Sequence, residues 1–418
     1  MTQSNIIVKI PQIGDGVFLD PQGKPVFVKC DTIDIAGLSG YTKVGVVYNR
    51  EGNEIDILAL DAPSHKWEAA MIYKVNGIKL DGTANTFQIR VGYGSSQLYT
   101  DYTSFSWSGT DVADFASALS THLEANHDGS GVIPRCRAYG DEVWIQLENY
   151  TNWTNNVGVT GSNGVSVVQN AMLDNYLPYG SNAVTKGAFT FGFPAANKWS
   201  YLGRAYANGR TPTTQESIKS TVQEPVTPDA FTNSEYCSDL HETFGTFDNY
   251  IESRTLLCPA SRNVGAARNG HKWTQMLKDY VWTNRNGVTA PLFPAHKYCA
   301  DYGKGNGIFG AGNWHLMDVP EMYNLMRQCR YCTNTAWINT SNGNLTNNRA
   351  NADAVNRTLL AMGASSSVNV AGYRWSSGRN SKSYGWMWVG SSGYLRYNYS
   401  FDNSFSVCPS LHLNLSKI

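Results

Sequence analysis

The sequence predicts a multidomain α+β protein in which short strands and loops outweigh helices. The chain has 418 residues, of which 12% are aromatic and 16% charged, and it contains 39 glycines. Such a composition favours strands and turns over long exposed helices. Helical spacing of apolar residues is confined to a few short segments, and the length allows two or three separate cores. We place the domains at residues 1–68, 69–175 and 176–418.

The first segment is typical of a small β domain. Turn-forming residues gather at 14–16 (GDG), 21–23 (PQG) and 51–53 (EGN). Between these turns lie short apolar runs at 26–28 (VFV) and 44–48 (VGVVY), which are typical of strands. We therefore expect a compact, turn-rich sheet at the start of the chain.

The second segment predicts four strands around one helix. Residues 71–75 and 86–91 alternate between apolar and polar side chains, and the Asp-Gly pair between them favours a hairpin. The same alternation returns at 143–147 and 165–168. The expected order is strand, strand, helix, strand, strand, which is a small α+β module.

The helix of this module is expected to begin near Thr110. Thr110 is a suitable cap, and the charge of Asp111 in the first turn favours the amino end of the helix dipole. A glycine-rich loop at 128–131 follows the helix and ends it. The residues expected on its buried face recur at helical spacing: Val112, Phe115, Ala116, Leu119 and Leu123.

The third segment predicts helices followed by strands. Helices are expected at 272–281, at 354–362, and from Asp318, where Asp318 and Glu321 have the spacing of a capping box. Gly363 is well placed to end the helix at 354–362. The strands expected after it are 368–374, 385–389, 394–401 and 405–413.

Charge and hydropathy disfavour nucleic-acid and membrane partners. Lys and Arg total 33, Asp and Glu also total 33, and no basic block occurs, so a groove that follows nucleic-acid phosphates is not expected. No run of about 18 apolar residues is present, so no membrane span is expected. Residues 1–10 lack the basic and apolar regions of a secretion signal, so we expect synthesis and folding in a cytoplasm.

The cysteines and acidic residues predict neither a disulfide scaffold nor a metal site. The eight cysteines are scattered along the chain, and Cys329 and Cys332 form the one CxxC pair. Zinc sites usually need a second such pair, so two reduced thiols are expected there. Clustered oxygen ligands for calcium are missing from the last hundred residues. We expect no cofactor and no metal.

The sequence does not contain the short motifs of common enzyme classes. GxSxG, HExxH and GxxxxGK(S/T) are absent and no GxGxxG follows a predicted strand, although a triad assembled from distant positions stays open. Paired carboxylates of the kind used by glycosidases are offered by Asp239 with Glu242 and by Asp318 with Glu321. The first pair has only proximity in sequence in its favour, and the second is better explained as a helix cap. We expect a binding or structural protein and not an enzyme.

Two resemblances extend this interpretation. The helix at 111–126 and the hairpin after it resemble small α+β modules of bacteriophage tail-sheath and other tail proteins. In the last part of the chain, six segments follow one another in a recognisable order: 294–302, 313–322 (NWHLMDVPEM), 373–377 (YRWSS), 385–388 (GWMW), 391–398 and 405–411. These segments resemble C-type lectin domains of the formylglycine-generating-enzyme-like branch. Met317, Cys408 and Ser410 depart from that family's usual residues.

The lectin-type resemblance implies a protein of the bacteriophage virion surface. Domains of that branch serve as variable display proteins of diversity-generating retroelements and occur on gut-phage virions. We therefore expect a tail fibre, head fibre or similar appendage, made in the host cytoplasm, that binds other virion proteins through its N-terminal domains and a bacterial surface receptor or glycan through its C-terminal domain. A homo-oligomer is expected, with a trimer as one option. The alternatives are a purely structural capsid or tail decoration protein and a bacterial surface adhesin.

The closing strands supply the candidate ligand-binding residues. On the strand at 394–401, one face alternates Leu395, Tyr397, Tyr399 and Phe401 and is expected to be core, and the other face is polar. Tyr, Ser and Asn on such a face resemble the contact residues of antibodies. A solvated strand face is the simpler alternative. Trp375, Trp386 and Trp388 are expected to be core and not sugar platforms. The predicted ligand-binding residues are Arg379, Asn380, Ser383, Tyr384, Met387, Tyr394, Arg396, Asn398, Ser400, Asp402 and Asn403.

Overall fold

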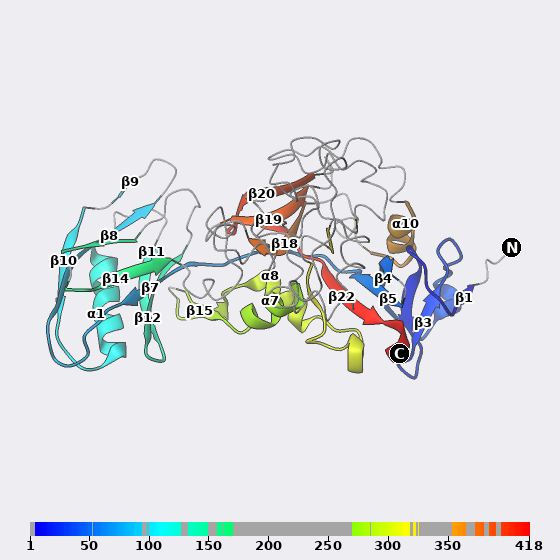
Figure 1. The fold of residues 1–418 in the computed structure, drawn as a ribbon, viewed down its shortest axis with the longest axis horizontal. Helices are drawn as coiled ribbons and strands as arrows, with labels where there is room; N and C mark the ends of the chain where they lie inside the picture. The colour runs from blue at the N-terminus through cyan, green and yellow to red at the C-terminus, as the bar shows by residue number, and fades with distance from the viewer. Residues whose placement is uncertain are drawn as a thin grey trace, which may run out of the picture.

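The computed structural model shows a fold dominated by β-sheets, with few helices (Figure 1). This confirms the β-rich α+β class that the composition predicts. The α+β module within residues 69–175, called the middle module below, lies at one end of the molecule (Figure 1). The strands formed by residues 5–59, called the first strands, and both termini lie toward the other end, and helices α7 and α8 lie between (Figure 1). The described residues are 5–51, 53–93, 98–99, 101–126, 133–148, 157–161, 163–169, 270–284, 286–317, 321–322, 325, 353–364, 373–379, 384–389 and 394–418.

The largest sheet is built from both ends of the chain. It has seven strands in the order β1-β3-β2-β4-β5-β22-β17. The last strand of the chain lies antiparallel to β5, with Ser410 opposite Leu58 and Asn414 opposite Glu54. The predicted division implies that residues 1–68 form a sheet of their own. In the structure they share this sheet with β17 and β22. The strands are β1 (Ile7–Val8), β2 (Gly16–Leu19), β3 (Pro25–Val28), β4 (Thr42–Glu51), β5 (Glu54–Ala59), β17 (His315–Leu316) and β22 (Pro409–Asn414).

The core against this sheet is also shared between distant segments. Apolar side chains of β2, β4 and β5 pack with Tyr302, Phe309 and Trp314, which come from the C-terminal part of the chain. The Trp314 indole donates to the Phe309 carbonyl at 3.1 Å and is fully buried. Two short 3-10 helices lie at the edges of this region, η1 (Ala36–Leu38) and η6 (Gly307–Phe309), and a third, η10 (Leu415–Lys417), follows β22.

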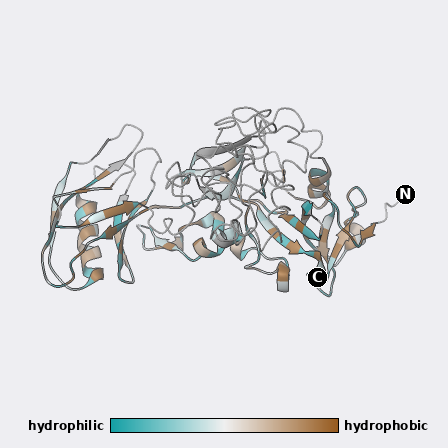
Figure 2. Cartoon of the chain, in the orientation of Figure 1, coloured by the Kyte–Doolittle hydropathy of each residue, from teal (hydrophilic) through white to brown (hydrophobic). Residues whose placement is uncertain are grey.

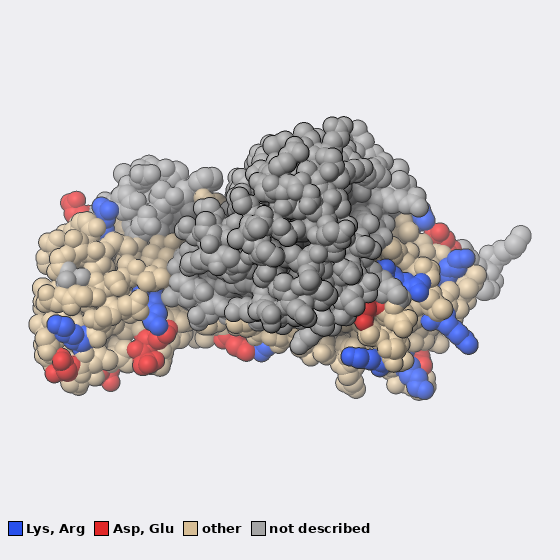
Figure 3. Space-filling view, in the orientation of Figure 1, with Lys and Arg blue, Asp and Glu red and all other residues tan. Residues whose placement is uncertain are grey.

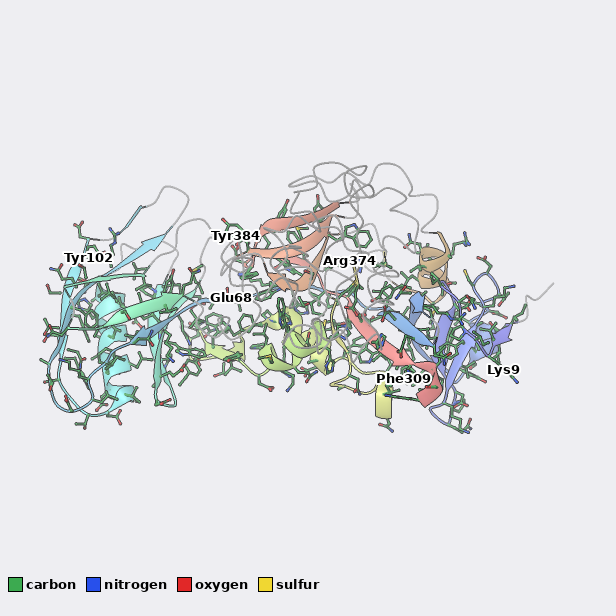
Figure 4. All side chains as sticks on the ribbon, in the orientation of Figure 1. Lys9, Glu68, Tyr102, Phe309, Arg374 and Tyr384 are labelled. Carbon is green, nitrogen blue, oxygen red and sulfur yellow. The ribbon has the colours of Figure 1, made fainter. Side chains whose placement is uncertain are left out.

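The connection between the first strands and the middle module is buried. The side chains of Trp67, Glu68 and Ala70 are 0% exposed. The backbone N–H groups of Trp67 and Glu68 donate to the Phe401 carbonyl, and the backbone N–H of Ala69 donates to Leu292. Exposed linkers are usual at domain boundaries. The predicted boundary at residue 68 (Glu68 is labelled in Figure 4) instead falls in a fully buried stretch of the chain.

The middle module contains two four-stranded sheets. One has the order β10-β8-β13, with β9 paired to β8, and the other has the order β11-β12-β7-β14. The predicted hairpin between 71–75 and 86–91 is therefore wrong, because β7 pairs with β12 and β14 while β8 belongs to the other sheet. The strands are β7 (Met71–Asn76), β8 (Asn85–Tyr93), β9 (Leu98–Tyr99), β10 (Thr103–Trp107), β11 (Ile133–Tyr139), β12 (Glu142–Glu148), β13 (Val157–Thr160) and β14 (Ser166–Gln169).

Helix α1 (Val112–Ala125) closes this module, as the sequence predicts. Its cap is Asp111 and not Thr110, because the Asp111 carboxylate accepts from the backbone N–H groups of Ala113 and Asp114 at 2.8 and 2.9 Å. The predicted apolar stripe faces a core that both sheets share, visible as the hydrophobic side of the helix in Figure 2. Its fully buried members are Phe115, Ala116, Leu119 and Leu123.

The helices of the C-terminal part are short. Helix α7 (Gly270–Leu277) overlaps the predicted helix at 272–281 but begins earlier and ends before strand β15; it buries Trp273 and Leu277, whereas Met276 is exposed. A two-stranded ribbon of β15 (Val281–Thr283) and β16 (Thr289–Pro291) leads to helix α8 (Pro294–Asp301). Helix α10 (Asp353–Ala361) ends as predicted, since Gly363 has a φ of 81°, which glycine adopts without strain.

The terminal sheet has five strands in the order β20-β19-β18-β21-β6. Strand β21 runs parallel to β18, and β6, from the first segment, pairs antiparallel with β21. A strand from near the start of the chain thus forms one edge of the terminal sheet, whereas β22 lies inside the first sheet between β5 and β17. The strands are β6 (Ser64–Lys66), β18 (Tyr373–Arg379), β19 (Tyr384–Val389), β20 (Tyr394–Ser400) and β21 (Ser404–Ser406).

Candidate functional site

The predicted ligand-binding positions lie on three neighbouring strands. Strand β19 is hydrogen-bonded to β18 on one side and to β20 on the other. The register places Tyr384 opposite Ser400 and Met387 opposite Arg396. Positions that are 9 to 16 residues apart in sequence are thus adjacent in space. Of the other predicted positions, Arg379 lies in β18, and Tyr394 and Asn398 lie in β20.

Only part of this set has a described side chain. Tyr384 is half-buried at the start of β19 (Figure 4). Its ligand-binding role stays a prediction. Asn380 and Ser383 lie outside the described residues, as do the side chains of Arg379, Tyr394, Arg396 and Asn398.

The alternation of side chains predicts that Met387 faces outward, but in the structure it faces inward. Its side chain is 0% exposed, and so is that of the adjacent Trp388. The register between β19 and β20 shifts between Gly385 and Met387, which marks an irregularity of the β-bulge type. A bulge interrupts the alternation of side chains between the two faces of a strand. The prediction for Met387 is wrong for this reason.

Ser400, Asp402 and Asn403 form the turn after β20. Ser400 is 5% exposed, and its hydroxyl donates to the Asp402 carboxylate. Asn403 donates its backbone and side-chain N–H groups to the Ser400 carbonyl, both at 3.1 Å, and its own carbonyl accepts from the Trp375 indole at 3.2 Å. The prediction that Ser400 faces a ligand is wrong, because the side chain is buried in the turn it holds. Asp402 and Asn403 are half-buried and stay predicted contacts.

An aromatic group on the same sheet reaches the surface. Tyr373 is 45% exposed and stacks on the half-buried Phe405, with ring centroids 5.8 Å apart and planes at 21°. Tyr399 meets Phe405 edge-on at 5.3 Å. We call Tyr373, Tyr399 and Phe405 the tyrosine cluster. The sequence argument placed Tyr399 in the core and did not select Tyr373, whose position at the start of an alternating strand is the available signal.

Tryptophans support the sheet from within. Trp375 and Trp388 are 0% exposed, which confirms their prediction as core, and the side chain of Trp386 lies outside the described residues. Trp67 stacks on Phe401 with centroids 4.0 Å apart. Its indole N–H also donates to the Ser376 carbonyl in β18 at 2.9 Å. These contacts join the terminal sheet to the buried connection between the first strands and the middle module.

A buried arginine lies among these side chains. Arg374 is 0% exposed, its guanidinium donates to the Cys408 sulfur, and it lies 6.0 Å from the centroid of the Trp388 ring. Burial raises the pKa of the Cys408 thiol, although the arginine acts in the opposite direction. A fully buried thiol with a raised pKa has little thiolate character and is not reactive. Cys408 is therefore a packing residue.

A second buried polar group lies at the pairing of β17 with β22, where the Tyr48 side chain of β4 also reaches. The Glu321 carboxylate lies 2.8 and 3.0 Å from His315 Nε2 and accepts from the Ser410 hydroxyl at 3.2 Å. Ser410 is also bonded to the Tyr48 hydroxyl at 2.9 Å. Glu321 is 1% exposed and takes part in this interior network; the capping box predicted with Asp318 stays a prediction, because Asp318 lies outside the described residues.

The described residues contain no group of three His, Cys, Asp or Glu side chains that could hold a metal ion. Within the same ranges, no helix is long and apolar enough to cross a membrane. The predicted carboxylate pair Asp239 and Glu242 and the CxxC pair Cys329 and Cys332 lie outside these ranges.

Comparisons with protein-family models, with curated proteins and with solved structures found no match. The functional interpretation therefore depends on the chain's own sequence patterns and geometry.

Proposed function

We propose that the chain is a bacteriophage virion-surface protein, such as a tail or head fibre, whose terminal region has a C-type lectin fold and binds a receptor or glycan on the bacterial surface. The sequence segments at 313–322, 373–377 and 385–388 carry the resemblance behind this proposal. The α+β module resembles phage tail modules and supports the same assignment. Fold-level analogy alone does not establish function, so the residues of the sheet must carry the argument.

The observation that carries the proposal is the assembly of the polar and aromatic positions on one set of strands. Strands β18, β19 and β20 are neighbours in a single sheet, and the tyrosine cluster reaches the surface beside them. Rigid tyrosines offer large contact areas at a low cost in side-chain entropy. The buried tryptophans and Arg374 hold the strands from within, which pre-organises the outer residues.

Binding of the purified, fluorescently labelled full chain to cells of the producing host tests this function. The Tyr394→Ala, Arg396→Ala double variant should lose at least tenfold in affinity while retaining the wild-type circular dichroism spectrum. A Tyr102→Ala variant, altered at an exposed tyrosine of the middle module, is the matched control and should bind normally. Equal binding by the double variant and the wild type would contradict the proposal.

One observation favours the second candidate, a purely structural decoration protein. Met387 and Ser400 are buried, so the candidate face has fewer ligand-facing residues than the sequence predicts. Virions that lack the chain distinguish the two functions. They should attach to cells poorly if the chain binds a receptor, and normally if the chain only decorates the particle.

A further inference from the structure

The seam between β5 and β22 holds a histidine between two carboxylates. His412 of β22 lies directly opposite Asp56 of β5. Its Nδ1 is 2.7 Å from Asp56 Oδ1, and its Nε2 is 2.8 Å from Glu54 Oε2. The cluster therefore sits where the last strand of the chain joins the first strands in one sheet.

The neighbouring strands add neutral amides to this cluster. Asn49 of β4 donates to Asp56 Oδ2 at 2.8 Å, and Asn414 of β22 donates to Glu54 Oε1. The ring thus lies within 3 Å of two acidic groups, Glu54 and Asp56, both on β5. The Asp56 side chain is fully buried, whereas those of Glu54 and His412 are each 22% exposed.

This geometry favours a charged ring. The Nδ1 contact with Asp56 is a hydrogen bond, whereas Glu54 Oε2 lies at ion-pair distance from Nε2 without hydrogen-bond geometry. Two carboxylates within 3 Å of one imidazole favour its positively charged form, the imidazolium, especially beside the buried Asp56.

We propose that protonated His412 stabilises the pairing of the C-terminal strand β22 with β5, and that this pairing becomes less stable when the ring loses its proton. This inference is independent of the proposed function. Histidines of an unfolded chain titrate near pH 6.5, at about their ordinary pKa. If the folded chain keeps a proton that the unfolded chain has released, stability is complete at lower pH and is lost as the pH rises.

Nuclear magnetic resonance of the full chain with ¹⁵N-labelled histidine tests the charge directly. The His412 signals are assigned by their absence from the His412→Gln variant, or by their shift in Glu54→Gln if the first variant does not fold. We expect both ring nitrogens to carry protons at pH 8. A neutral ring at that pH would overturn the proposal.

The effect on stability is measured by urea unfolding between pH 6.5 and 9.5. Over this range, the unfolding equilibrium constant of the wild type should rise at least tenfold more than that of Glu54→Gln, which keeps an oxygen acceptor but removes one charge. His122→Gln is the control for loss of a histidine elsewhere in the chain, because burial lowers the pKa of His122 and so shifts it in the direction opposite to that proposed for His412. It should follow the wild type. If the unfolding equilibrium constants of the wild type and Glu54→Gln depended on pH in the same way, this role of His412 would be refuted.

Discussion

Replacement of Trp67 tests whether the connection between β6 and the middle module is packed against α8 and the terminal sheet. The indole is 0% exposed. It stacks on Phe401 at 4.0 Å and meets the rings of Phe293 and His296 edge-on at 5.5 and 4.9 Å. Its N–H donates to the Ser376 carbonyl at 2.9 Å. A single substitution therefore removes contacts to α8, β18 and the end of β20.

The expected loss follows from these contacts. Truncation of a buried tryptophan to alanine costs about 3 to 5 kcal/mol, because apolar burial is lost and a cavity remains. Trp67→Phe keeps the aromatic packing but leaves the Ser376 carbonyl without its donor, which costs about 1 to 3 kcal/mol. The two variants should therefore rank below the wild type in that order, with the alanine variant least stable.

Urea unfolding followed by circular dichroism and by tryptophan fluorescence measures both losses. Trp107→Ala is the matched control, because Trp107 is partly exposed and packs on Phe115 within the middle module only. We expect Trp67→Ala to separate the transitions of the module and of the rest of the chain, and Trp107→Ala to leave the rest unchanged. A loss below about 1 kcal/mol for Trp67→Ala would refute a buried junction.

Three further predictions concern the interior. Burial lowers the pKa of His296 to about 3, so this histidine stays neutral in the folded chain while the unfolded chain is protonated. The free energy of unfolding should therefore fall by about 1.4 kcal/mol per pH unit between pH 6.5 and pH 3. His296→Gln should flatten this profile in urea unfolding, and an unchanged profile would count against a buried neutral His296. Glu321→Ala should cost about 3 kcal/mol in urea unfolding, since it removes the acceptor bonded to the buried His315 Nε2 and one of the two hydrogen bonds of the Ser410 hydroxyl; a loss under 1 kcal/mol would contradict the network. Gly45→Ala should destabilise the protein at least twice as much as Gly82→Ala, because a Cβ at Gly45 would lie 2.2 Å from the Leu58 carbonyl oxygen. A Cβ at Gly82, which has a φ of 87°, would meet open space and add backbone strain alone. Thermal melts that give equal losses of stability would exclude the clash at Gly45.

Features set by neighbouring residues could be predicted from the sequence. The apolar spacing of α1, the glycine that ends α10 and the buried tryptophans of β18 and β19 all agree with the structure. In each case, the side chains concerned lie within a few residues of one another. Local periodicity and turn chemistry are therefore sufficient to recognise them.

Pairings between distant segments could not be predicted. Strand β22 joins β5, and β6 joins β21, across more than three hundred residues. An apolar run indicates a strand but does not identify its neighbour in the sheet. The apparent hairpin of β7 and β8 failed for the same reason, since β7 finds its partners beyond α1.

Two of the candidate site residues were misplaced by irregularities of the backbone. The bulge in β19 places Met387 in the core, although strict alternation directs it outward. At the end of β20, the Ser400 hydroxyl turns to Asp402 and stays buried. Alternation predicts the face of a residue only while a strand remains regular.

Hydrogen–deuterium exchange of the full chain, with and without cell-envelope vesicles from the host, tests most directly whether the closing strands contact the bacterial surface. Bound vesicles should slow exchange in peptides covering 384–389 and 394–403, with little change in α1 or β8. Slowed exchange confined to the middle module, or no change in any peptide, would contradict the account.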